Sequence, residues 1–261
     1  MKYISIISLF TLSIGFFSCE KDGIEANRQW QFADPNKANL KVVNAYTSNI
    51  PAGATGVGVT RFYIYQNIDK LNGNAISANG SWPGSATYSS VNPGENTFNF
   101  ILDRRVGTDY GKPVKGDTAF SGKATLQAGK FYTMFMIGEA PMQTLWTVED
   151  KLIEPKENFY AARFVNLAIY PAATPRPIDI YSRREKRNIA SKLEFKTITE
   201  FIEIPLPDRT IGVDTLDIRD AGTTKNLYFT TLSPTSRRSY TFYNYGRGTF
   251  AADRLSLLIN K

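Results

Sequence analysis

The sequence predicts an all-β chain in which two antiparallel β-sandwich domains follow each other in tandem. Beyond residue 38, apolar residues occur in short runs that are rich in β-branched and aromatic side chains and that alternate with polar residues. Turn signals such as Asn72-Gly73 and Pro93-Gly94 separate these runs. The runs recur about every 8 to 15 residues, and no segment beyond residue 38 has the pattern of a helix of three turns. This combination favours β-sandwiches.

The motifs that mark the strands occur twice along the chain, in the same order. The matching pairs are "LKVVNAY" (40–46) with "ARFVNLAIY" (162–170), "RFYIYQN" (61–67) with "PIDIYSR" (177–183), "GKFYTMFMIG" (129–138) with "RRSYTFYNYG" (237–246), and "TLWTVEDK" (144–151) with "RLSLLINK" (254–261). Such ordered repetition predicts two copies of one domain of about 100 to 115 residues, which is the size of an Ig-like sandwich.

The repeats divide the chain into two domains and a linker. We expect the first Ig-like domain at residues 39–152, the linker at 153–158 and the second domain at 159–261. Pro155 cannot donate a ladder hydrogen bond, so it ends the preceding strand. A linker this short predicts two domains arranged end to end with limited freedom.

Residues 1–18 have the order of charges and apolar residues of a secretory signal peptide. Lys2 supplies the positive start, and the apolar run from Ile4 to Phe17 has 14 residues. This run is shorter than the roughly 20 residues that a membrane-spanning helix needs. We therefore expect the chain to be exported.

The single cysteine follows this segment directly. The residues Phe16-Phe17-Ser18-Cys19 resemble the lipobox of bacterial lipoproteins. This resemblance implies that Cys19 is linked to diacylglycerol and becomes the N-terminus, with residues 19–38 as a lipidated, flexible tether. A leftover buried cysteine near an ordinary signal peptide is the alternative, although an unpaired thiol is unusual in an exported protein.

The tether begins with charged residues. Glu20, Lys21 and Asp22 resemble the export signal that carries Bacteroidetes lipoproteins to the outer face of the outer membrane. The resemblance implies an outer-membrane, lipid-anchored protein at the cell surface. A solvated tether on a protein that faces the periplasm is the alternative.

The strand motifs of the first repeat carry a family resemblance. "LKVVNAYTSN", "FYIYQN", "ATYSSVNPGENTFNF" and "ATLQAGKFYTMFMIG" resemble successive strands of the bacterial domain of unknown function 4397, an Ig-like module of cell-surface and exported proteins. The resemblance covers residues 40–152 and is weaker in the second copy, where "IPLPDRTIG" replaces the Pro-Gly hairpin. It implies a fold and a cell-envelope setting, and it supplies no catalytic residues.

The composition argues against most enzyme classes. The chain has no histidine, which excludes Ser-His-Asp and Cys-His nucleophiles and imidazole metal sites. The glycine-rich "GATGVG" (53–58) lacks the Lys-Ser/Thr of a phosphate-binding loop, so we interpret it as an ordinary loop. We expect no enzyme, no cofactor and no metal.

Carboxylates are the remaining route to catalysis. In "DTLDIRD" (214–220), Asp214 shares a strand face with Leu216 and Ile218, whereas Asp217 points to the opposite side. These two residues therefore cannot form the closely spaced pair of a glycosidase on one face. We expect them to be solvated strand ends, like Asp103, Asp109 and Asp117.

Two places are candidates for ligand contact. The first is "YSRREKRN" (181–188), where four basic residues surround Glu185; they are Arg183, Arg184, Lys186 and Arg187. This segment is either a contact site for lipopolysaccharide or acidic polysaccharide, or a solvated hairpin tip. The second is Trp82 in "NGSWPGS", which is either an exposed glycan platform in a turn or part of the cover of the core.

Together these features predict a non-enzymatic, lipid-anchored cell-envelope protein whose tandem domains serve as a structural, adhesive or binding module. The alternative is a carbohydrate-binding accessory lipoprotein of an outer-membrane uptake system. The expected partners are the membrane, through the lipid anchor, and envelope proteins or polysaccharide. Although the net charge is +7, export argues against a nucleic acid.

Overall fold

The protein is seen here as a computed structural model, which describes residues 34–46, 61–77, 79–84, 87–102, 118–138, 144–168, 176–207, 212–245 and 254–260. The signal peptide, Cys19, most of the tether, the "GATGVG" loop and the three aspartates between residues 103 and 117 lie outside these ranges. The described residues contain no helix that is long and apolar enough to cross a membrane.

All regular structure in the described ranges is β-strand. The strands of the first half are β1 (Ala38–Tyr46), β2 (Phe62–Gln66), β3 (Asp69–Lys70), β4 (Ser81–Trp82), β5 (Ser89–Val91), β6 (Gly94–Leu102), β7 (Thr118–Leu126), β8 (Phe131–Gly138) and β9 (Thr144–Glu149). Those of the second half are β10 (Phe159–Asn166), β11 (Ile178–Ser182), β12 (Arg187–Leu193), β13 (Thr197–Ile198), β14 (Ile202–Pro205), β15 (Asp214–Asp220), β16 (Asn226–Leu232), β17 (Ser239–Tyr245) and β18 (Arg254–Ile259).

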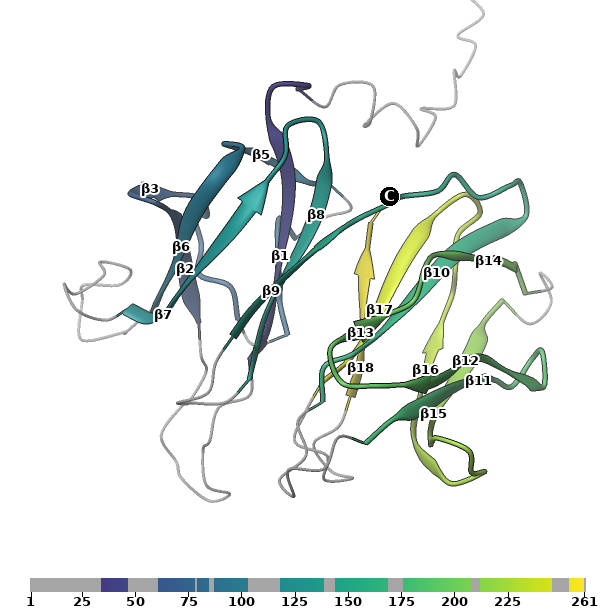
Figure 1. Ribbon diagram of the computed structural model, residues 1–261. Helices are drawn as coiled ribbons and strands as arrows, with labels where there is room; N and C mark the ends of the chain where they lie inside the picture. Colours follow the sequence, from purple (N-terminus) through teal and green to yellow (C-terminus); the bar gives the residue numbers. More distant parts are fainter. Residues whose placement is uncertain are drawn as a thin grey trace, which may run out of the picture.

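Each half forms two sheets with the same strand order. In the first half the sheets run β4-β1-β8-β9, with β5 also on β1, and β3-β2-β6-β7. In the second half they run β13-β10-β17-β18, with β14 also on β10, and β12-β11-β15-β16. Figure 1 shows the first pair of sheets on the left and the second pair on the right. The predicted all-β sandwich fold is confirmed.

One strand pair in each half is parallel rather than antiparallel. The β1–β8 pair and the β10–β17 pair both run parallel, whereas their neighbours in the same sheets pair antiparallel. The chain leaves β1 and crosses to the other sheet before it returns as β8, so no tight hairpin forces these two strands to run in opposite directions. The expectation of purely antiparallel sheets is therefore wrong at these two pairs.

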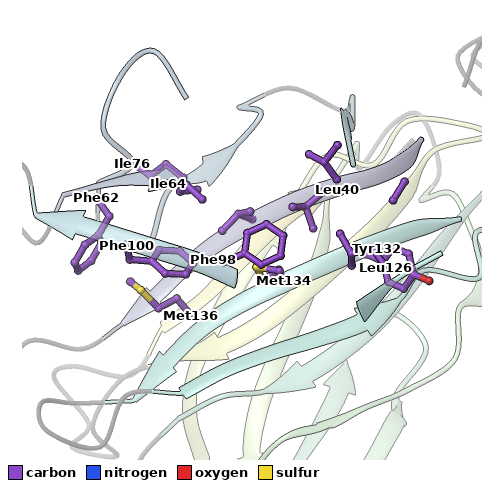
Figure 2. Packing of buried hydrophobic residues seen from close by; sticks show 13 residues of the cluster. Leu40, Phe62, Ile64, Ile76, Phe98, Phe100, Leu126, Tyr132, Met134 and Met136 are labelled. Atoms are coloured by element: carbon purple, nitrogen blue, oxygen red, sulfur yellow. The ribbon is translucent and has the colours of Figure 1, made fainter. Parts of the chain in front are cut away.

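Each sandwich has its own apolar core. In the first, buried side chains of β1 and β8 meet those of β2 and β6, and Figure 2 shows Leu40, Met134, Phe98 and Ile64 among them. In the second, side chains of β10 and β17 meet those of β11 and β15. The alternation of these strands explains this, because every second residue points to the same face of its sheet.

In each half, a tyrosine hydroxyl is hydrogen-bonded to the backbone of the segment that leads into a strand, β8 in the first half and β17 in the second. The hydroxyl of Tyr132 accepts a hydrogen bond from the backbone N–H of Gln127 (3.1 Å), and that of Tyr240 accepts one from Thr235 (3.0 Å). Both bonds span five residues and resemble the tyrosine corner of Ig-like sandwiches. The repeated Tyr-Thr pair of the sequence therefore marks the same corner in both halves.

A third core joins the two sandwiches. Its buried members are Val43, Ala45, Phe135, Ile137, Val165, Leu167, Tyr243 and Leu258. The first four come from β1 and β8 of the first sandwich, and the others come from the second. The sheets β4-β1-β8-β9 and β13-β10-β17-β18 therefore pack against each other, and the described residues form a stack of four sheets with three cores.

This packing corrects the expected end-to-end arrangement. In Figure 1, β1, β8 and β9 lie beside β17 and β18, so the sandwiches are side by side. Strands at this interface are apolar on both faces: in β8, Met134 and Met136 face the first core, whereas Phe135 and Ile137 face the third. Burial on both faces requires such continuous apolar runs.

A buried ion pair lies in the interface between the sandwiches. The guanidinium of Arg163 on β10 donates to Asp150 after β9, and both side chains are almost fully shielded from water. Arg163 Nε also donates to Thr241 Oγ1 (2.8 Å). Asp150 Oδ2 accepts from Thr133 Oγ1 (2.6 Å) and from the Tyr88 hydroxyl (2.7 Å). Both charged groups thus have several partners, as burial requires.

The polar groups of the interface follow the repeat. Lys41 occupies in β1 the position of Arg163 in β10, because Lys41 pairs in register with Thr133 and Arg163 with Thr241. Asp150 follows β9 as Asn260 follows β18. Thr241 Oγ1 donates to Asn260 Oδ1 (2.6 Å), and Asn260 Nδ2 donates to the Tyr88 hydroxyl (2.8 Å). Lys41 Nζ donates to the Ile259 carbonyl (2.6 Å). The interface is approximately two-fold symmetric, with two cations and one carboxylate.

Burial alters the acidity of Lys41. Loss of contact with water lowers the pKa of Lys41 from 10.5 to about 8, although the negative charge of Asp150 opposes this shift. The ammonium also lies 4.9 Å from the ring centroid of Tyr88. Burial together with the Asp150 charge raises the pKa of Tyr88 well above its usual value.

We predict that Arg163→Ala lowers the free energy of unfolding by about 3 to 5 kcal/mol, because it leaves the Asp150 carboxylate buried without a countercharge. The matched control is Arg237→Ala, whose pair with Glu154 is about half exposed at both ends and spans 3.6 Å. That control should cost no more than about 1 kcal/mol. Urea unfolding of both variants measures the difference, and equal losses would show that the interface pair does not stabilise the fold.

We predict that stability rises between about pH 8 and pH 10 through Lys41. Above pH 8 the folded protein releases the Lys41 proton, whereas the unfolded chain keeps it until about pH 10.5, so the unfolded state binds more protons and a rising pH favours folding. Urea unfolding at about pH 7.5 and pH 9.5 should show this rise in the wild type and not in Lys41→Met. The same pH dependence in both proteins would contradict the assignment.

Candidate functional site

The basic segment forms the hairpin between β11 and β12. The turn spans residues 183–186, and Lys186 has a positive φ of 54°. The backbone N–H of Glu185 donates to Ser182 Oγ (3.1 Å), and that of Arg183 donates to the Thr215 carbonyl (3.0 Å). These bonds fix the turn, so the directions of its side chains are set by the backbone.

Arg184 points toward the second core. Its guanidinium donates to Asp214 Oδ2 (3.2 Å) and to the Pro205 carbonyl (2.8 Å). Asp214 is fully buried, and its Oδ2 also accepts from the Tyr160 hydroxyl (3.0 Å). Burial and the Asp214 charge raise the pKa of Tyr160. Arg184 is therefore the countercharge of a buried carboxylate.

The other residues of the hairpin point elsewhere. Glu185 pairs with Arg187 (2.7 Å) and with Arg184 (3.3 Å), while Lys186 is exposed at the tip. Arg183 turns to the outer face of the sheet. The structure thus does not bring the four predicted basic side chains together into one cationic cluster, and three of them are already paired with carboxylates.

Five side chains make a cluster on the outer face of the sheet β12-β11-β15-β16, which we call the outer-face cluster; they are Tyr181, Arg183, Asp217, Arg219 and Phe229. Tyr181, Asp217 and Phe229 form a row across β11, β15 and β16, because they are directly paired in register. Figure 1 shows this sheet on the side of the second sandwich that faces away from the first.

Asp217 holds the cluster together. Its carboxylate accepts from Arg183 Nε (2.7 Å) on one side and from Arg219 Nη2 (3.3 Å) on the other. The Arg183 guanidinium lies 4.9 Å from the centroid of the Phe229 ring, and that of Arg219 lies 3.4 Å from the centroid of the Tyr181 ring. Each cation is therefore oriented by one carboxylate oxygen and one aromatic face.

Exposure differs across the cluster. Asp217 is buried, whereas the Phe229 ring is 58% exposed and the Arg183 side chain is about half exposed. With two guanidiniums and one carboxylate, the cluster carries a net charge of +1. It presents an aromatic surface and guanidinium N–H donors to solvent.

The predicted roles of the aspartates need correction. Asp214 and Asp217 do point to opposite faces, as expected, but both are buried and ion-paired rather than solvated. Sequence reasoning missed this because Arg183 and Arg184, which pair with these aspartates, come from the turn after β11. It also missed Phe229, although in "NLYFTTL" this residue is out of phase with the core-facing Leu232, which signals an outward ring.

Trp82 lies in strand β4 rather than in a turn. It pairs with Val42 of β1, and its half-buried ring packs against the first core. The peptide bond between Trp82 and Pro83 is cis. The contacts of this ring are those of a side chain that covers the core.

A shallow pocket of about 450 Å³ lies beside β8 and β9. Its lining includes Lys130 and Glu149, which pair with each other (2.9 Å), and Asp150, which belongs to the interface network. No group of three or more acidic or thiol side chains that suits a metal ion occurs in the described ranges. The pocket offers less to a ligand than the outer-face cluster.

Comparisons with known proteins give a limited result. No protein-family model matches the chain, and no curated protein matches it. Family 41 carbohydrate-binding modules that recognise α-glucan, from streptococcal virulence factors, cover 79% of this chain and 92% of their own at 10% identity and a TM-score of 0.23.

Two other solved structures are similar to the same degree. A DUF3823 family protein from Bacteroides ovatus has 12% identity and a TM-score of 0.20, and the match covers 86% of this chain and all of that one. A provisionally named cell adhesion protein from Bacteroides fragilis has 9% identity and a TM-score of 0.21, covering 86% and 98%. TM-scores of this size assign no function to this chain, and the resemblance to the domain of unknown function 4397 stays a prediction.

We predict that Arg184→Ala destabilises the protein by about 2 to 3 kcal/mol, because Asp214 then loses its countercharge. Arg187→Ala is the matched control in the same hairpin, since its side chain is 63% exposed. The control should change the free energy of unfolding by less than about 1 kcal/mol. Denaturant unfolding measures both. An unchanged free energy of unfolding in Arg184→Ala would contradict this role and support the solvated hairpin tip that the sequence also allows.

Proposed function

We propose that this chain is a non-enzymatic, lipid-anchored protein of the cell envelope whose paired sandwiches act as a binding or adhesive module. The observation that carries the proposal is the third core, which fixes the two sandwiches as one body and so presents the outer-face cluster in a constant orientation. Exposed polar and aromatic groups on a rigid scaffold are suited to recognition.

The buried carboxylates also support a structural body rather than a reactive site. Asp150 is held by Arg163 and Thr133, and Asp214 is held by Arg184 and Tyr160. Asp179 accepts three hydrogen bonds, from Asn188 Nδ2 (3.1 Å) and from the backbone N–H groups of Lys192 (2.8 Å) and Gly222 (2.9 Å). Each of these carboxylates already has a role in holding strands or turns together.

The anchoring part of the proposal rests on the sequence before the described residues. The apolar segment, Cys19 behind it and the charged residues Glu20, Lys21 and Asp22 support an exported lipoprotein at the outer membrane. The strand motifs that resemble the domain of unknown function 4397 support the same setting. An accessory role in carbohydrate uptake is the second candidate, and the exposed Phe229 ring favours it.

The anchor is tested by Cys19→Ala. We predict that this variant takes up no labelled fatty acid and moves from the membrane fraction to the soluble fraction, because alanine has no thiol to carry the diacylglycerol whose acyl chains would hold the protein on the membrane. Replacing Glu20, Lys21 and Asp22 by Ser is the matched control: it should keep the label and change only whether protease reaches the protein on intact cells. A Cys19→Ala variant that still carries the label would refute lipidation at this residue.

A further inference from the structure

The outer-face cluster differs from the same place in the first sandwich. In the first sandwich the row across β2, β6 and β7 is Tyr65, Asn99 and Ser121, and Ser121 Oγ donates to Asn99 Oδ1 (2.7 Å). The second sandwich has Tyr181, Asp217 and Phe229 at these three positions.

The neighbouring positions differ in charge. Arg183 follows β11 where Asn67 follows β2, and Arg219 lies two residues after Asp217 as Ile101 lies two residues after Asn99. The strand order and the corner tyrosines are alike in the two repeats, yet one sandwich carries a neutral row and the other a charged aromatic cluster. Packing of the fold therefore does not by itself require the cluster.

The chemistry of the cluster selects its ligand. The exposed face of the Phe229 ring can stack on the C–H face of a pyranose, whose weakly positive hydrogens meet the negative face of the ring. The half-exposed guanidinium of Arg183 beside it suits a carboxylate, which accepts paired hydrogen bonds from arginine. The positive charge of the half-exposed Arg183 favours an acidic sugar over a neutral one.

The size of the cluster agrees with a sugar chain rather than a protein. Tyr181 and Phe229 are two strands apart, so the row spans about 10 Å, the length of a disaccharide, and Arg219 covers its Tyr181 end. A stable protein partner buries about 800 Å² on each side around an apolar centre. Among the described residues, the strongly exposed large apolar side chains are Ile68, Val213, Phe229, Leu257 and Ile259. Of these, only Phe229 belongs to the row.

We propose that the outer-face cluster binds a polysaccharide that contains uronic acid, with a sugar ring on Phe229 and a carboxylate on Arg183. Asp217 and Arg219 act by positioning, because Asp217 orients both guanidiniums and Arg219 covers the Tyr181 ring. This inference rests on the proposed function as a binding module and names its ligand class and its site.

Binding is measured on a soluble chain of residues 20–261, which contains every described residue, with polygalacturonate and alginate as acidic probes and amylose as the neutral one. The wild type should bind the acidic probes, and the binding should weaken as salt is added, since exposed charges are screened within about 8 Å at physiological ionic strength. Amylose should bind at least tenfold more weakly, on the order expected for the loss of one charged hydrogen bond.

Two substitutions copy the first sandwich into the second. Phe229→Ser and Arg183→Asn install the residues that the first sandwich has at these positions, and each should weaken polygalacturonate binding about tenfold. Phe229→Tyr keeps an aromatic face and should retain binding. Arg187→Asn is the control for charge, because it removes one exposed cation from the same hairpin without touching the cluster.

The outcomes separate this inference from the proposed function. Full binding by Phe229→Ser, or an equal loss in Arg187→Asn, would overturn the cluster as the site. Binding of amylose alone would overturn the acidic ligand and leave a binding module. Capture of an envelope protein through Phe229, with no binding to any polysaccharide, would overturn the polysaccharide as the ligand and identify a protein partner instead. The absence of every one of these activities would overturn both proposals.

Circular dichroism melts should be nearly unchanged in Phe229→Ser, because the ring is exposed.

Discussion

The contact between Arg163 and Asp150 is the interaction on which the rest of the structure depends. It lies between the two sandwiches, beside the third core, and both side chains are almost fully shielded from water. Taking two charges out of water is costly, and the network of hydroxyl donors and acceptors around the pair offsets that cost. A misaligned interface would leave both charges without partners, so the pair selects one relative position of the sandwiches.

The repeat explains why this interface is possible. A duplicated sheet can pack on its own copy through the same face, as identical subunits do about a two-fold axis. Lys41 and Arg163 occupy equivalent positions, as do Asp150 and Asn260. A fully symmetric version would bury two carboxylates close together, and the asparagine removes that repulsion. The two repeats thus keep the same backbone arrangement, whereas their charged side chains at the interface differ.

Sequence patterns predicted the strands well because short alternating runs and turn residues are local signals. The repeat was likewise visible, since Val43-Asn44 and Val165-Asn166 occupy equivalent places in β1 and β10. The side-by-side packing was not predicted, because it depends on residues far apart in the chain. One signal did exist: "FYTMFMIG" is apolar on both faces, which a sheet with one solvated face does not need. The outer-face cluster needed the register of three strands, which no single motif contains.

The parallel pairing of β1 with β8 also has a mechanical consequence. The two strands are in register from Asn39 with Phe131 to Tyr46 with Gly138. If the anchor lies at the N-terminus and a ligand holds the second sandwich, tension enters the fold along β1. Hydrogen bonds between strands run across this direction, so the load is shared by the whole ladder in shear instead of opening it one bond at a time. With such an anchor, β1 would be the first strand of the sandwiches to bear the load.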